Sequence, residues 1–171
     1  MLALLVALLA CTEEAPILSG LEDPAAGVGE AVEARPYQKP EGVLVDVPYL
    51  GGRSWEQSRD LVSVQLGDIQ EVVPLDPRDG TEYRFASGHV RVHDDLIYLV
   101  HVDLPRATRR SSALLELGFP PQADRWFELH DEFRLRWFSN FERLRMGRAE
   151  ENPEMVTWVE AMRWNPRSTS R

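Results

Sequence analysis

The sequence contains a single cysteine, Cys11, and a single lysine, Lys39. One cysteine leaves no partner for an intramolecular disulfide and no thiolate pair for a zinc site. The other basic residues are arginines that form no concentrated run, and the net charge is -9. Nucleic-acid binding needs a concentrated positive surface, so we expect no nucleic-acid partner.

The sequence also lacks the motifs of the common enzyme classes. It has no phosphate-binding loop, no dinucleotide fingerprint, no His-Glu-x-x-His and no Gly-x-Ser-x-Gly. The adjacent acids Asp94-Asp95 and Glu150-Glu151 fall in predicted turns, where no apolar cleft separates their pKa values. Ser111-Ser112 is interpreted as a helix start. We therefore expect no cofactor and no catalytic activity.

The first residues predict where the protein resides. Residues 1–10 carry no polar side chain, but a membrane-spanning helix needs about 20 apolar residues. A short apolar run that ends on a small residue is typical of a secretion signal. Leu8-Leu9-Ala10-Cys11 resembles the lipobox of bacterial lipoproteins. The resemblance implies cleavage before Cys11 and attachment of diacylglycerol to its thiol.

A lipid on Cys11 would anchor the protein in a membrane of the bacterial cell envelope. Thr12, in place of Asp, resembles lipoproteins that are sorted to the outer membrane, which is the location we favour for a Gram-negative cell. Residues 12–42 contain four prolines, four glycines and seven acids against Arg35 and Lys39. This composition predicts a disordered acidic linker. We expect one folded domain over residues 43–166 and a disordered tail over residues 167–171.

The first half of the domain predicts one helix and four strands. Alternating valines predict a strand over residues 43–47. Ser54, with Gln57 three residues later, forms a capping box for a helix that ends at Gly67. Three antiparallel strands follow within residues 82–103. The third is apolar on both faces from Leu96 to Val100, which favours a central position, and Pro105 is expected to end it.

The second half repeats this order. Thr108 or Ser111 is expected to cap a helix that ends before Gly118. Strands are predicted at residues 125–129, 132–138 and 141–148, with Ser139-Asn140 as a turn. Residues 155–164 fit a helix or a strand, and we favour a strand because Val, Thr and Trp suit a pleated surface.

This order predicts an α+β fold. We expect one or more antiparallel sheets made by two successive helix-plus-β-meander units, with the helices packed on one face. The layout resembles β-lactamase inhibitor protein and the small lipoprotein of the outer-membrane β-barrel assembly machinery, in which Gly, a Ser or Thr cap, a short helix and Leu-Gly-x-Pro precede a meander. The matching residues are Gly52, Ser54 and Leu66-Gly67, although Ile69 replaces the proline, and then Leu117-Gly118-Phe119-Pro120. The resemblance implies a binding or scaffolding module without a cofactor.

The strongest candidate site is a cluster of arginines. Two of them share a face of one predicted strand, and two share a face of the next, so that a hairpin would join them: Arg134, Arg136, Arg143 and Arg145. Such a patch suits an anionic partner, for example a lipid headgroup, a cell-wall carboxylate or an acidic protein surface. The alternative is a solvated face paired with Glu132 and Glu142. Phe133, Leu135 and Trp137 are expected on the opposite face, and Trp126, Trp137, Trp158 and Trp164 are interpreted as core or sheet packing.

The histidines are a weaker candidate. His89 and His93 share a strand face, and His101, Asp94, Asp95 and Asp103 lie near them in sequence. These imidazoles and carboxylates could in principle supply a metal site, but Arg91 lies between the two histidines on the same face and would repel a cation. We therefore interpret them as solvated strand residues and predict no metal site. His130-Asp131-Glu132 is interpreted as a turn.

Three hypotheses for the function follow. The first is an envelope lipoprotein whose domain binds an envelope protein or an anionic envelope component without catalysis. The second is a small-ligand-binding or hydrolytic domain with a site between the sheet and the helices, which a deep pocket with convergent polar groups would favour. The third is a purely structural tether.

Overall fold

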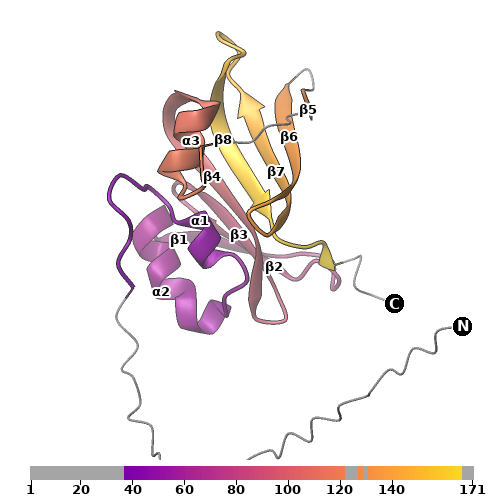
Figure 1. Cartoon of the computed structure of the whole chain (residues 1–171). Helices are drawn as coiled ribbons and strands as arrows, with labels where there is room; N and C mark the ends of the chain where they lie inside the picture. Colours follow the sequence, from indigo (N-terminus) through magenta and orange to yellow (C-terminus); the bar gives the residue numbers. More distant parts are fainter. Residues whose placement is uncertain (1–36, 122–126, 129–130, 167–171) are drawn as a thin grey trace, which may run out of the picture. The chain divides into compact units, whose positions relative to one another are not determined.

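The computed structural model describes residues 37–121, 127–128 and 131–166 (Figure 1). A compact unit begins at Gln38. The predicted signal, Cys11, most of the linker, Trp126 and the tail lie outside the described residues. None of the helices in the described ranges is long and apolar enough to cross a membrane.

An antiparallel sheet dominates the unit, which confirms the α+β class. In the described part of the chain it has eight strands, in the order β1-β2-β3-β4-β8-β7-β6-β5. Two meanders, β1 to β4 and β5 to β8, therefore meet where β4 pairs with β8. The central position of the strand that starts at Leu96 and the strand over the 155–164 segment are both confirmed. The strands are β1 (Ile69–Pro74), β2 (Thr81–Phe85), β3 (Gly88–His93), β4 (Leu96–Arg109), β5 (Phe127–Glu128), β6 (Glu132–Phe138), β7 (Phe141–Arg148) and β8 (Met155–Met162).

The helices are α1 (Val47–Leu50), α2 (Trp55–Leu66) and α3 (Arg110–Glu116). Helix α2 begins as predicted, because the Ser54 hydroxyl accepts a hydrogen bond from the backbone N–H of Gln57. It ends at Gly67, whose φ of 93° is a conformation that suits glycine.

The strand predicted over residues 43–47 is wrong. The Asp46 side chain accepts a hydrogen bond from the N–H of Tyr49, and Pro48 lies in the first turn of the short helix α1. Proline is well suited to that position because its φ is already helical and it has no N–H to leave unpaired. Capping chemistry therefore outweighs the alternating valines at this point.

The predicted cap of the second helix is also wrong. Arg109 occupies the N-cap position of α3 and makes no capping hydrogen bond with its side chain. Thr108 lies in β4 and its hydroxyl donates to the carbonyl of Arg106. Pro105 does not end β4, which continues to Arg109 through an irregularity in its pairing with β8 between Asp103 and Thr108.

Strand β1 was not predicted from the sequence. It is an edge strand that pairs only with β2, and nearly all of its side chains are exposed. A strand that buries neither face lacks the alternation of polar and apolar residues by which strands are recognised.

The core joins the helices to the sheet. Buried residues from α1, α2, α3 and the strands form one continuous cluster, in which the Trp55 ring stacks on Tyr83 at 4.0 Å between centroids. A second, small cluster contains Tyr98, Leu99 and Met162. It arises because β4 has an extra residue: Ile97 pairs with Val92 and Leu99 with Arg91, which leaves Tyr98 in a bulge.

Candidate functional site

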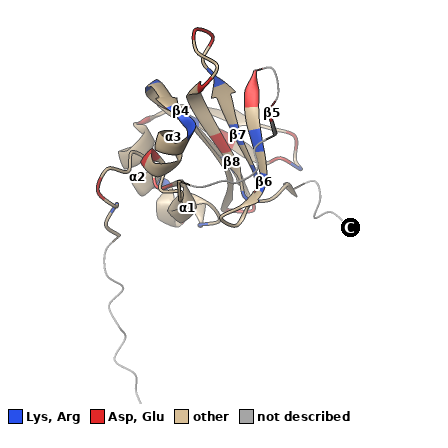
Figure 2. Cartoon of the chain, turned by 45° about the horizontal axis from the view of Figure 1, so that its top comes forward, with Lys and Arg blue, Asp and Glu red and all other residues tan. Residues whose placement is uncertain are grey.

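A row of charged and polar side chains crosses the sheet. Its members are direct cross-strand partners on successive strands, and they comprise two glutamates, three arginines and two histidines. Figure 2 shows acidic and basic residues of this kind on the strands of the second meander. In order from β1 to β6, the row consists of Glu71, Arg84, His89, His101, Glu160, Arg145 and Arg134.

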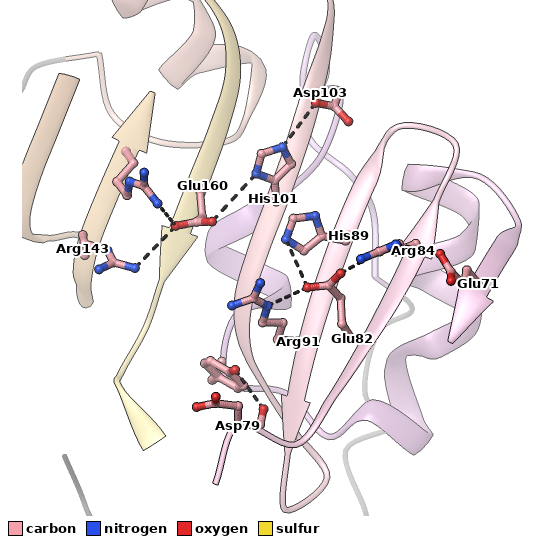
Figure 3. A network of polar contacts seen from close by, with 12 residues as sticks. Glu71, Asp79, Glu82, Arg84, His89, Arg91, His101, Asp103, Arg143 and Glu160 are labelled. Atoms are coloured by element: carbon pink, nitrogen blue, oxygen red, sulfur yellow. Dashed lines mark hydrogen bonds and ion pairs between the residues drawn. The ribbon is translucent and has the colours of Figure 1, made fainter. Parts of the chain in front are cut away.

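Three buried glutamates organise the charges of this face. Glu82, Glu132 and Glu160 have relative exposures of 4%, 3% and 9%. Glu82 accepts hydrogen bonds from Arg84 Nε at 2.7 Å and Arg91 Nε at 2.8 Å (Figure 3). Burial alone would raise the pKa of Glu82, but these two hydrogen bonds outweigh it and lower the pKa below its ordinary value. Glu82 is therefore held in its charged form.

The hairpin brings the four predicted arginines together. Arg134 lies opposite Arg145, and Arg136 lies opposite Arg143. Glu132 accepts hydrogen bonds from Arg134 and from Arg145 Nε, the latter at 2.7 Å. The predicted pairing of this glutamate with the arginines is thus present. It neutralises one end of the arginine cluster.

The other end of the cluster is less compensated. Arg143 Nη2 lies 3.5 Å from Glu160 Oε1, which also accepts from Arg145 Nη1 at 3.2 Å. Glu142, the other expected partner, instead accepts a hydrogen bond from the backbone N–H of Asn165. Within the described ranges, the exposed Arg136 has neither an ion pair nor a side-chain hydrogen bond.

The prediction that Trp137 packs against the sheet is wrong. Its exposed fraction is 78%, and its φ of 56° is in the left-handed region. A positive φ is uncommon for a bulky residue. It interrupts the regular strand geometry, in which successive side chains point to opposite faces of the sheet. Phe133 and Leu135, by contrast, are buried as expected.

Two shallow pockets lie next to Trp137 and Arg136. The first has a volume of about 310 Å³ and is lined by Arg136, Trp137, Glu142, Arg143, Met162 and Asn165. The second, of about 290 Å³, includes Arg91, Tyr98 and Leu99 and shares Arg143, Met162 and Asn165 with the first. We call the two together the sheet groove. Its lining contains three guanidinium groups and an exposed indole, together with the acids Glu142 and Asp79.

The spacing of the histidines suggested that His89 and His93 belong together, but the structure groups His89 with His101. His89 pairs across strands with His101, and the two rings stack with 4.5 Å between centroids. His101 in turn lies opposite Glu160. His93 is not in this group and lies 3.4 Å from Asp94. The group of His89, His101 and Glu160 depends on the register of three strands, which the local sequence does not specify.

A separate pocket of about 340 Å³ tests the hypothesis of a site between the sheet and the helices. Its lining includes Gln65 from α2 and Asp103 from β4, together with Ser87 and mostly apolar residues. Gln65 Oε1 is occupied by the N–H of Asp46. Asp103 is the one acid among the described residues that line this pocket.

No protein-family model matches the chain, and no curated protein matches it. Solved structures with a similar arrangement include two bacterial proteins. An extracellular protein containing an SCP domain from Bacillus anthracis gives a TM-score of 0.45 at 8% identity, covering 75% of this chain and 49% of that chain. A cysteine-rich secretory protein from Staphylococcus aureus gives 0.41 at 10% identity, covering 68% and 46%. The chain thus spans about half the length of these proteins, and a likeness at this level assigns no function.

Proposed function

We propose that this protein is a lipid-anchored envelope protein whose folded unit binds an anionic component of the cell envelope without catalysis, and that the sheet groove is the binding site. The observation that carries this proposal is the position of Arg136. Its guanidinium has no carboxylate partner in the described part of the chain, and it lies beside the exposed Trp137 in the wall of a pocket.

The chemistry of the groove selects the kind of ligand. A guanidinium binds a carboxylate through two parallel hydrogen bonds, and Arg143 supplies a second guanidinium from the neighbouring strand. The indole of Trp137 offers a flat apolar face on which a sugar ring can stack. A carboxylate-bearing glycan of the cell wall provides both features, so we propose it as the ligand.

The amino-terminal sequence supports this location. The lipobox-like segment before Cys11 would place the chain at a membrane. A flexible linker over residues 12–42 would span roughly 30 Å, because the span of such a chain grows with the square root of its length. The folded unit would then remain near the membrane while it reaches the wall polymers around it.

The test uses the full chain with Cys11→Ser, so that a lipid does not contribute to binding. The protein is sedimented with purified peptidoglycan, and separately with phosphatidylglycerol vesicles. We expect sedimentation with peptidoglycan that Arg136→Glu and Trp137→Ala each reduce at least about tenfold, the loss that accompanies one charge-assisted contact of about 1.4 kcal/mol. Arg59→Glu serves as the control, since Arg59 is an exposed arginine on helix α2.

Binding to vesicles alone, with the same dependence on Arg136, would identify a lipid headgroup as the ligand and contradict the glycan. Equal binding by the Arg136→Glu and Arg59→Glu variants would contradict the groove as the site.

A further inference from the structure

We propose that His89, His101 and Glu160 form a site for one divalent transition-metal ion, with zinc as the best fit. This inference is independent of the proposed function. The three residues are consecutive members of the charged row, on β3, β4 and β8 (Figure 3). One ligand atom of each lies within 4.8 Å of the other two.

One nitrogen of each imidazole lacks a hydrogen bond. Both His89 Nε2 and His101 Nδ1 are buried, and neither has a hydrogen-bond partner among the described residues. Their nearest acidic oxygens are Glu82 Oε2 at 3.9 Å and Glu160 Oε2 at 4.0 Å, which is beyond hydrogen-bond range. Buried polar atoms are nearly always paired, so two adjacent unpaired nitrogens need an explanation. A bound cation would satisfy both.

The neighbours of the site orient two of the ligands. On the far side of its ring, His101 Nε2 lies 3.3 Å from Asp103 Oδ1. A proton shared with this carboxylate resides on Nε2 and leaves the lone pair on Nδ1, which is the arrangement found behind many histidine ligands of zinc. The two carboxylate oxygens of Glu160 also have different neighbours. Oε1 contacts Arg143 and Arg145, whereas Oε2 is directed at His101.

The guanidinium groups near the site are paired with carboxylates. Arg91, whose charge argued against a metal at the level of the sequence, is held on Glu82 at 2.8 Å. Arg145 is similarly held between Glu132 and Glu160.

Two imidazoles and one carboxylate are a ligand set typical of catalytic and other open zinc sites, in which a water occupies the fourth position. Tetrahedral bonds of 2.0–2.1 Å place ligand atoms about 3.4 Å apart. The ligand atoms lie within 4.8 Å of one another, so their separations exceed this value by up to about 1.4 Å. Metal binding therefore requires the side chains to move, and the nearly parallel imidazole rings must rotate before their lone pairs converge on one ion.

The test uses the full chain without an affinity tag, freed of metal by a chelator. It is titrated with Zn²⁺ by calorimetry and with Co²⁺ by visible absorption. We expect one ion per chain and the intense visible bands of tetrahedral Co²⁺. His89→Ala and His101→Ala should abolish binding, and Asp103→Asn should weaken it by about 10- to 100-fold by releasing the orientation of His101.

His93→Ala is the matched control, since His93 lies on the same strand and has its own acidic neighbour outside the group. Binding that survives His89→Ala, or that is lost equally in His93→Ala, would overturn the proposal. The unmutated chain tests the metal site even if a variant fails to fold. If it does not bind one ion per chain, or if its Co²⁺ complex lacks the tetrahedral spectrum, the proposal is overturned. Arg136→Glu should leave Zn²⁺ binding unchanged, which separates this result from the fate of the sheet groove.

Discussion

Arg136 and Arg143 lie directly opposite each other on β6 and β7, but their surroundings differ. Arg143 lies 3.5 Å from the buried Glu160, whereas Arg136 is exposed and has no acid within ion-pair distance among the described residues. The two arginines should therefore differ in what they contribute to folding. Arg143 is expected to stabilise the sheet through Glu160 as well as to line the groove, whereas Arg136 is expected to serve the ligand alone.

This difference predicts different effects of charge reversal. Arg136→Glu should change the free energy of unfolding by no more than about 0.5 kcal/mol, as is usual for exposed positions. Arg143→Glu should lower it by about 1 to 3 kcal/mol, because it removes a partner from a buried carboxylate and adds a like charge beside it. Urea denaturation of the two variants measures both values. Equal effects would contradict the assignment of separate roles.

The arginine cluster was accessible to prediction because a hairpin is a local feature. Ser139-Asn140 indicated a turn, both residues have positive φ, and the turn fixes the pairing of Arg136 with Arg143. The group of His89, His101 and Glu160 was not accessible in the same way. Glu160 is 59 residues from His101 along the chain, and only the pairing of β4 with β8 brings them together.

The helices show a similar division between local and distant signals. Ser54 and Gly67 were sufficient to place α2, because capping depends on residues next to the helix. The strand predicted at residues 43–47 failed because Asp46 and Pro48 favour a helix start more strongly than valines favour a strand. The exposure of Trp137 follows from its positive φ. The alternating sequence around Trp137 predicts a regular strand and does not indicate this backbone conformation.

Gly147 is expected to tolerate no side chain. A Cβ at this position would lie 1.9 Å from Trp158 Nε1, so the indole that stacks on His101 would have to move. We expect Gly147→Ala to lower the free energy of unfolding by about 1 to 3 kcal/mol, the usual cost of overpacking, and to change the tryptophan fluorescence. Gly42→Ala is the control for a glycine in open space, where only the positive φ of 78° opposes a side chain. A neutral result at Gly147 would show that Trp158 does not cover it.

Asp95 is expected to make the stability of the unit depend on pH. Its carboxylate accepts hydrogen bonds from the Ser54 hydroxyl at 2.5 Å and from the N–H of Glu56 at 3.0 Å, at the start of α2. The bond from Ser54, and then that from Glu56, lower the pKa of Asp95 below 3.8. A lowered pKa in the folded state means that the stabilisation is complete above the unfolded value and is lost as the pH falls through the folded value.

Asp95→Asn should therefore melt at a lower temperature than the unmutated chain at pH 7, and the two melting temperatures should converge as the pH falls through the lowered pKa of Asp95. Asn also suits the φ of 62° at this position, so the substitution removes charge without straining the backbone. Thermal melts at several pH values measure the difference. A gap that stays constant down to pH 2 would show that the charge of Asp95 does not stabilise the helix.

Cys11 is expected to carry the lipid. It is the only cysteine in the chain, so no other thiol can accept diacylglycerol after Cys11→Ala. In a bacterial host grown with labelled palmitate, the unmutated protein should become labelled and fractionate with membranes. The Cys11→Ala variant should lose the label and either remain uncleaved or be released from the membrane. Cys11→Ser is a matched variant of nearly the same size that also lacks the thiol and should behave as Cys11→Ala does.

Labelling of either variant would contradict thiol acylation. Loss of the label with unchanged membrane retention would mean that another part of the chain holds the protein there.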